Sequence, residues 1–167
     1  MITYVTLEEV EDYLGGTLKA SKWFAAPPAD KQTAVIAATR IINRLNYKGF
    51  PAAVYHAREA GATLSQLREL SDQQDLVFPR DEDTHIPRAI KEACCEIAFA
   101  ILDGNNPEDE IRDLATVSEG IGPLSFRTTY DRTQAPEWVL AGVPSPIAWQ
   151  LLRPYLRDPR AIAVSRG

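Results

Sequence analysis

The sequence predicts an α+β fold that is mainly α: a small bundle of about four helices, a β-hairpin and an extended C-terminal strand. Apolar residues recur at spacings of three and four over residues 28–45 and 87–104, as on the buried side of a helix. Residues 117–130 instead alternate apolar and polar side chains around a glycine-rich break, and residues 161–166 alternate small or polar with β-branched ones. In a chain of 167 residues, 45% of them hydrophobic, we expect one domain over residues 1–158, with its hairpin at about 114–130, and a tail over 159–167.

The N-terminal part predicts two helices. Thr6–Glu9 has the S/T-x-x-E form of a capping box, so a short helix begins there and ends at the glycine pair 15–16. A longer helix over residues 28–45 opens at a proline, and its apolar stripe faces the core. We expect Trp23 and Phe24, just before it, to pack beneath this helix rather than to form a ligand site.

The pattern weakens over residues 50–74. Leucines at every third position over 64–70 predict a short helix capped near Thr63, and the remainder is expected to be a surface excursion. The central core helix follows, beginning at Pro87 and ending at Gly104. Its buried side is predicted from residues at helical spacing: Ile90, Ala93, Cys94, Ala98 and Ile101 or Leu102.

The hairpin and a fourth helix complete the predicted elements. Gly120–Pro123 reverses the chain, and its proline belongs at a strand start or an edge because it cannot donate to a ladder. Residues 147–156 form the fourth helix, which should kink or end near Arg153 because Pro154 lacks a backbone donor. The second strand presents one face by period two, formed by Leu124, Phe126, Thr128 and Tyr130.

The sequence offers no candidate catalytic, cofactor or metal site. His56 and His85 lie in predicted loops, apart from any recognisable nucleophile motif. Cys94 and Cys95 are adjacent, so a bridge between them would be strained, and zinc requires four converging ligands. Phosphate-loop, dinucleotide and zinc-protease motifs are missing. We therefore expect that the protein is not an enzyme and uses no cofactor.

The charges are unevenly distributed along the chain. Its net charge of -5 argues against a surface evolved to bind nucleic acid. Asp81–Asp83 lacks the ligand spacing of an EF-hand, so it is expected to be a solvated acidic loop or a subunit contact. Two interpretations stay open: ordinary solvated faces, or a contact between a basic C-terminal part and an acidic surface of a neighbour. The basic residues of the last quarter are Arg127, Arg132, Arg153, Arg157, Arg160 and Arg166.

Targeting signals are missing from the sequence. It contains no run of about 18 apolar residues and no N-terminal signal-peptide pattern. We therefore expect no membrane association and a protein made and used in a cytoplasm.

The order of the motifs resembles the head-tail connector, or adaptor, family of tailed bacteriophages. The motifs are TLEEVEDYL, ATRIINRLNYKG, FPR, IPRAIKEACCEIAFAILDG, VSEGIGPLSFRTTY, LLRPYL and VSRG. The resemblance covers residues 6–167, and the stretch 50–74 is longer here than in the shorter members. Some members carry the label of a DnaT-like single-stranded-DNA-binding protein.

The resemblance implies a structural role in the virion neck. Such adaptors assemble in the host cytoplasm as homo-oligomers, typically a twelve-fold ring beneath the portal protein. The ring extends the channel through which packaged double-stranded DNA passes without sequence-specific binding. It also receives a downstream neck or tail-completion protein.

Three groups of residues become candidate contacts under this resemblance. The extended tail would dock on the portal or an adjacent subunit through Ile162, Val164 and Arg166, because an unpaired strand can join another chain's sheet. The acidic loop would line the channel or form a contact through Asp81, Glu82 and Asp83. The hairpin would lie between subunits through Val117, Glu119, Leu124, Phe126 and Arg127.

Two alternatives remain. A single-stranded-DNA-binding module would stack bases on aromatic side chains that lie among arginines in the sequence, Tyr130, Trp138, Trp149 and Tyr155. The overall acidity weakens this alternative. The other is a different ring component of the same virion, such as a stopper or tail-end protein.

Overall fold

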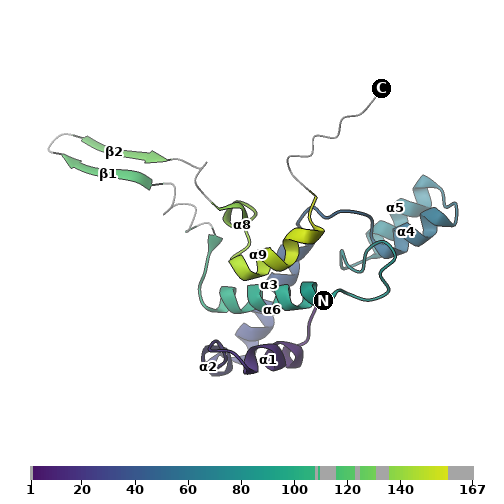
Figure 1. The fold of residues 1–167 in the computed structure, drawn as a ribbon, viewed down its shortest axis with the longest axis horizontal. Helices are drawn as coiled ribbons and strands as arrows, with labels where there is room; N and C mark the ends of the chain where they lie inside the picture. Colours follow the sequence, from purple (N-terminus) through teal and green to yellow (C-terminus); the bar gives the residue numbers. More distant parts are fainter. Residues whose placement is uncertain (1, 108, 110–115, 123–124, 131–135, 158–167) are drawn as a thin grey trace.

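A computed structural model describes residues 2–107, 109, 116–122, 125–130 and 136–157, and these residues are mainly helical (Figure 1). A short 3-10 helix, η2, covers Arg153–Tyr155, and two strands, β1 and β2, cover Thr116–Gly122 and Ser125–Tyr130. The α-helices in this part of the chain are α1 Leu7–Gly15, α2 Ala20–Ala25, α3 Pro28–Asn43, α4 Ala52–Glu59, α5 Leu64–Gln73, α6 Arg88–Leu102, α8 Glu137–Leu140 and α9 Pro146–Leu152.

Helix α6 forms the centre of the core. It packs against α3, α9 and α1, which surround it in Figure 1. The predicted stripe is confirmed for its first four members, which are fully buried: Ile90, Ala93, Cys94 and Ala98. Ile101 and Leu102 are only partly buried at the core margin. The 3-4 spacing thus identified the buried side of this helix, because side chains three and four positions apart share one helix face.

The first helices confirm the predicted capping box and add an element that was not predicted. The Thr6 amide donates to Glu9 Oε2 (2.8 Å) and the Glu9 amide donates to Thr6 Oγ1 (3.2 Å), which starts α1. Helix α2 follows, and it contains the two aromatic residues that we expected to pack beneath the next helix, α3. Trp23 is fully buried, whereas Phe24 is 50% exposed, so the expectation of burial is right for Trp23 and wrong for Phe24.

Residues 52–73 form a pair of helices beside the main body (Figure 1). The predicted helix near Leu64 is confirmed as α5, with the predicted cap at Thr63, whose amide donates to Gln66 Oε1 (2.9 Å). Helix α4 lies in a stretch expected to be a surface excursion, and α5 packs against it. None of the residues of α5 is buried, and Leu64 is 79% exposed.

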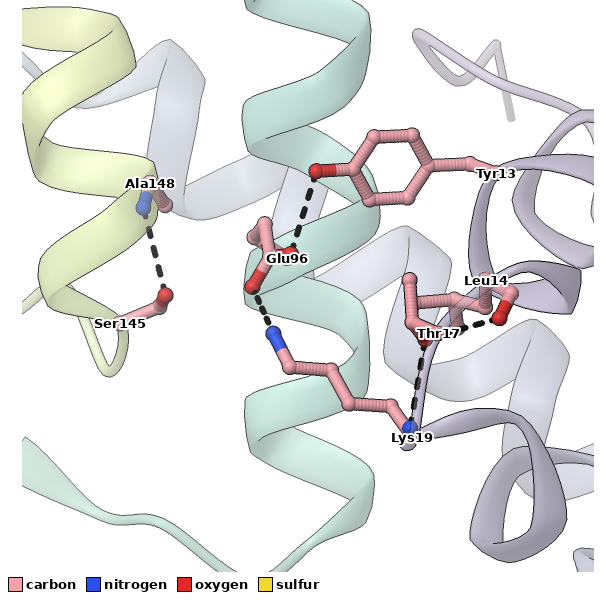
Figure 2. Close-up of polar contacts among 7 residues, drawn as sticks. All are labelled: Tyr13, Leu14, Thr17, Lys19, Glu96, Ser145 and Ala148. Atoms are coloured by element: carbon pink, nitrogen blue, oxygen red, sulfur yellow. Dashed lines mark hydrogen bonds and ion pairs between the residues drawn. The ribbon is translucent and has the colours of Figure 1, made fainter.

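Helix α9 ends just before Pro154, as the sequence predicts. Ser145 opens α9, and its hydroxyl accepts a hydrogen bond from the Ala148 amide (3.2 Å; Figure 2). The helix stops at Leu152 and continues as the 3-10 turn η2, which contains Pro154. The predicted end near Arg153 is therefore confirmed.

The predicted fold class, α+β with about four helices, is wrong. The described residues contain eight α-helices, and the described core is formed by helices and the loops between them. Strands β1 and β2 form a separate antiparallel two-stranded ribbon, which adds no sheet layer to the body (Figure 1). The predicted C-terminal strand over 161–166 lies outside the described residues. Helices α2, α4 and α8 escaped prediction because each has too few turns to establish a period.

No helix in the described part of the chain is both long and apolar enough to cross a membrane.

Candidate functional site

Three loop segments meet beside the end of α9. The Lys48 amide donates to the Tyr155 carbonyl oxygen (2.9 Å), and the Arg157 amide donates to the Asn46 carbonyl oxygen (3.0 Å). Lys48 Nζ also donates to the Pro154 carbonyl oxygen (3.1 Å). The loop after α3 is thereby fixed to the segment that follows α9.

Arg80 joins the third segment to this junction. Its Nε donates to the Lys48 carbonyl oxygen (2.8 Å) and its Nη2 to the Gly49 carbonyl oxygen (2.7 Å). Its guanidinium lies 5.8 Å from the ring centroid of Tyr47. Burial lowers the pKa of Arg80, the Asp81 carboxylate opposes this effect, and the positive charge of Arg157 lowers the pKa further. Arg80 and Arg157 are therefore close enough to repel each other.

We call the set Lys48, Arg80, Arg153 and Arg157 the cationic surface. Lys48, Arg153 and Arg157 are exposed, and Arg80 is half-buried. In the described part of the chain none of the four lies in an ion pair, whereas five other cations do. Those pairs are Lys19–Glu96, Lys22–Asp103, Lys31–Glu11, Arg88–Glu92 and Lys91–Glu9.

The acidic loop 81–83 forms hydrogen bonds to residues beside the junction. Asp81 adopts a positive φ of 51°, and its Oδ1 accepts a hydrogen bond from the Phe50 amide (2.8 Å). Glu82 accepts from the Tyr55 hydroxyl (3.2 Å), and the Asp83 amide donates to the Arg80 carbonyl oxygen (3.0 Å). These predicted contact residues thus take part in bonds within the chain, and their role toward a channel stays a prediction.

Phe50 brings an aromatic ring to the edge of the cationic surface. It is 39% exposed, and the guanidinium of Arg58 lies 5.0 Å from its ring centroid. Sequence reasoning missed Phe50, because only the fold brings its loop beside residues 153–157. Its position two residues after Lys48 was the one available signal.

The aromatic residues predicted for base stacking are less available. Trp149 and Tyr155 pack against the core, and the Tyr155 ring meets Phe78 edge-on, with centroids 5.7 Å apart. Trp138 is half-buried, and for Tyr130 the structure describes only the strand backbone. The predicted stacking set does not form one platform.

A buried polar cluster connects α1 to α6 (Figure 2). Glu96 is 4% exposed; its Oε1 accepts from the Tyr13 hydroxyl (3.1 Å), and its Oε2 forms an ion pair with Lys19. Burial, followed by the neighbouring Glu96 charge, raises the pKa of Tyr13. Because both carboxylate oxygens have partners within the protein, the cluster is a structural link.

The predicted contact residues on the ribbon and tail are only partly described. Val117 and Glu119 lie in β1, and Phe126 and Arg127 lie in β2, where Glu119 is opposite Thr128. The register shifts between Thr116 and Ser118, which leaves Val117 as an extra residue in β1. Outside the described residues lie Leu124, Ile162, Val164 and Arg166.

No metal site emerges from the described residues, in which no three His, Cys, Asp or Glu side chains converge.

Comparison with known proteins gives one result. Among curated proteins and among solved structures, nothing matches the chain. Residues 3–167 match the model of the family described as "Putative DnaT-like ssDNA binding protein", and the chain belongs to this family.

Proposed function

We propose that this protein is a structural head-tail connector of a tailed bacteriophage, which forms a ring beneath the portal and joins the head to the neck or tail. The order of sequence motifs from residue 6 to residue 167 supports this proposal. The observation that carries it is the ribbon formed by β1 and β2. In the virion neck, the ring would extend the DNA channel and receive a downstream neck protein.

The ribbon stands apart from the helices. Within the described part of the chain each strand pairs only with the other, and Figure 1 draws the ribbon away from the body. An isolated two-stranded hairpin is marginally stable in water, and its open edges can pair with another chain. A neighbouring subunit supplies such a partner, and a head-to-tail contact of this kind closes into a ring when its rotation allows.

Replacement of residues 116–130 by a short Gly/Ser linker tests this role. The two strands pair with each other and contribute no hydrogen bonds to the described helices, so the variant should keep its helical circular dichroism. The wild type should co-sediment with purified portal protein. The variant should lose this co-sedimentation, because subunits that are no longer joined in a ring must each bind the portal alone. Leu64→Ser, an exposed change in α5, is the matched control and should still co-sediment. Undiminished co-sedimentation of the ribbon variant would contradict the proposal.

Single-stranded DNA binding is the second candidate function. The family description supports it more directly than it supports a connector, because no comparison refers to a phage neck. The cationic surface also favours it, because phosphate binding requires lysines and arginines that are not already paired.

Fluorescence anisotropy with a labelled oligo(dT) tests this second candidate. A DNA-binding protein should bind at 50 mM salt and lose affinity steeply by 200 mM, because binding releases counterions. A wild-type protein that leaves the oligonucleotide free at both salt concentrations would exclude this candidate, while portal binding would be unaffected.

A further inference from the structure

We propose that the cationic surface, Lys48, Arg80, Arg153 and Arg157, holds the phosphodiester backbone of single-stranded nucleic acid, and that Phe50 stacks on one of its bases. This inference rests on the second candidate function and names the surface that would perform it. It is independent of the ring.

The first step of the argument is charge. The net charge of -5 makes the protein as a whole repel nucleic acid, so binding requires a local region of opposite sign. Five of the described lysines and arginines lie in ion pairs with carboxylates on α1, α6 and the adjoining turn. The cationic surface holds cations without such pairs, so their charges remain available to phosphates.

The second step is rigidity. Lys48 and Arg157 belong to segments joined by two backbone hydrogen bonds of 2.9 and 3.0 Å. Arg80 is held by bonds to three carbonyl oxygens, those of Val77, Lys48 and Gly49. A surface whose backbone is already fixed loses little conformational entropy when a ligand binds.

The third step distinguishes nucleic acid from an acidic protein. Phe50 lies at the edge of the cationic surface with part of its ring exposed, and Arg58 lies over it. Cations beside an exposed ring are the combination that single-stranded nucleic acids use, since phosphates bind the cations and bases stack on the ring. An acidic peptide has the charges but does not require the ring.

The test uses three variants of the full chain with oligo(dT) as the probe. The triple variant Lys48→Gln, Arg153→Gln, Arg157→Gln removes exposed charges and leaves Arg80 in its structural bonds. Its matched control, Lys22→Gln, Arg88→Gln, Lys91→Gln, makes the same change in net charge at residues that lie in ion pairs. Phe50→Ala removes the ring. Thermal unfolding of each variant verifies that it folds.

The surface variant should bind at least roughly 10-fold more weakly, and the magnitude of its slope of log affinity against log salt should fall by about 2, because each lost phosphate contact removes about 0.7. Phe50→Ala should weaken binding by about 5-fold or more with an unchanged slope, as expected for the loss of one stacked base. The control should stay within about 2-fold of the wild type, because surface charges away from the contact act through a screened field.

Four results would overturn the inference. If wild type binds and the surface variant binds equally well, the surface is wrong while DNA binding stands. If the control loses as much affinity, only net charge matters. If polyglutamate competes as well as oligo(dT) and Phe50→Ala has no effect, the surface binds acidic proteins. If wild type itself fails to bind, the second candidate function and this inference both fail.

Discussion

The backbone amide of Lys48 donates to the carbonyl oxygen of Tyr155 at 2.9 Å. This bond joins the loop after α3 to the turn after α9, and the isolated bridge between Tyr47 and Leu156 extends the contact. The positive charges of Lys48 and Arg157, which belong to these two segments, are thereby held on one surface. The junction is therefore a structural element whose disturbance should affect both stability and binding.

Gly49→Ala should disturb that junction. Gly49 has a φ of +70°, and a Cβ at this position would overlap the Asp81 carboxylate that accepts the Phe50 amide. The left-handed conformation alone costs a residue with a Cβ about 1–2 kcal/mol. We expect a lower midpoint in urea unfolding. Gly15→Ala, at a site with open space and no positive φ, should leave stability unchanged or slightly higher. Equal midpoints for wild type and Gly49→Ala would refute this reading of the loop.

Glu96→Ala should destabilise the contact between α1 and α6. The change leaves the Tyr13 hydroxyl and the Lys19 ammonium without their buried acceptor, at a cost of about 1–3 kcal/mol. The control is Glu92→Ala on the same helix, which removes the surface pair with Arg88 and should cost at most about 0.5 kcal/mol. Urea unfolding of both variants measures the difference, and a Glu96→Ala protein as stable as Glu92→Ala would show that the cluster contributes little.

Acid should weaken the contact of Glu9 with Lys91. The hydrogen bond from Lys91 Nζ, helped by the Thr6 amide, lowers the pKa of Glu9 from its ordinary value of 4.5. A folded-state pKa below the unfolded one gives stability that is present above the unfolded pKa and lost as pH falls through the folded pKa. Since the Glu9 side chain is 42% exposed, solvent screens its charge and the effect on stability is small.

Glu9→Gln isolates this charge, because glutamine can still complete the capping box. The melting temperature of wild type should exceed that of Glu9→Gln at about pH 7, and the difference should shrink toward zero by about pH 3. A difference that stays constant across this range would mean that the charge of Glu9 adds nothing.

The two cysteines should not react with thiol reagents in the native protein. Cys94 is fully buried and Cys95 is 2% exposed. Burial raises the pKa of each thiol to about 12, and the thiolate is the reactive form. A disulfide-exchange reagent at about pH 8 should label neither residue until denaturant is added, and then both. Rapid labelling of the native protein would contradict the packing of α6.

The sequence predicted the elements whose signals are local. The capping box at Thr6 and the buried side of α6 depend on residues within a few turns of one another, so the pattern carries the information. Pro154 likewise predicted the end of α9 from its own chemistry.

The candidate site was not predictable in the same way. The cationic surface arises where the loop after α3 meets residues 153–157, and no local pattern encodes that meeting. Phe50 and Arg80 were therefore missed. Trp149 and Tyr155 were wrongly expected to be available for base stacking, because nearby arginines in the sequence do not reveal that both rings pack against the core. Alternation over residues 117–130 was also given too much weight in the fold class, since the strands add no layer to the body.

Electron microscopy of the purified protein mixed with its portal protein tests the central claim most directly, because the ribbon is proposed to join subunits into a ring. The account predicts a ring of this protein stacked on the portal, with β1 and β2 at the contacts between neighbouring subunits. Portal particles without added density, beside a protein that sediments as a monomer, would contradict it.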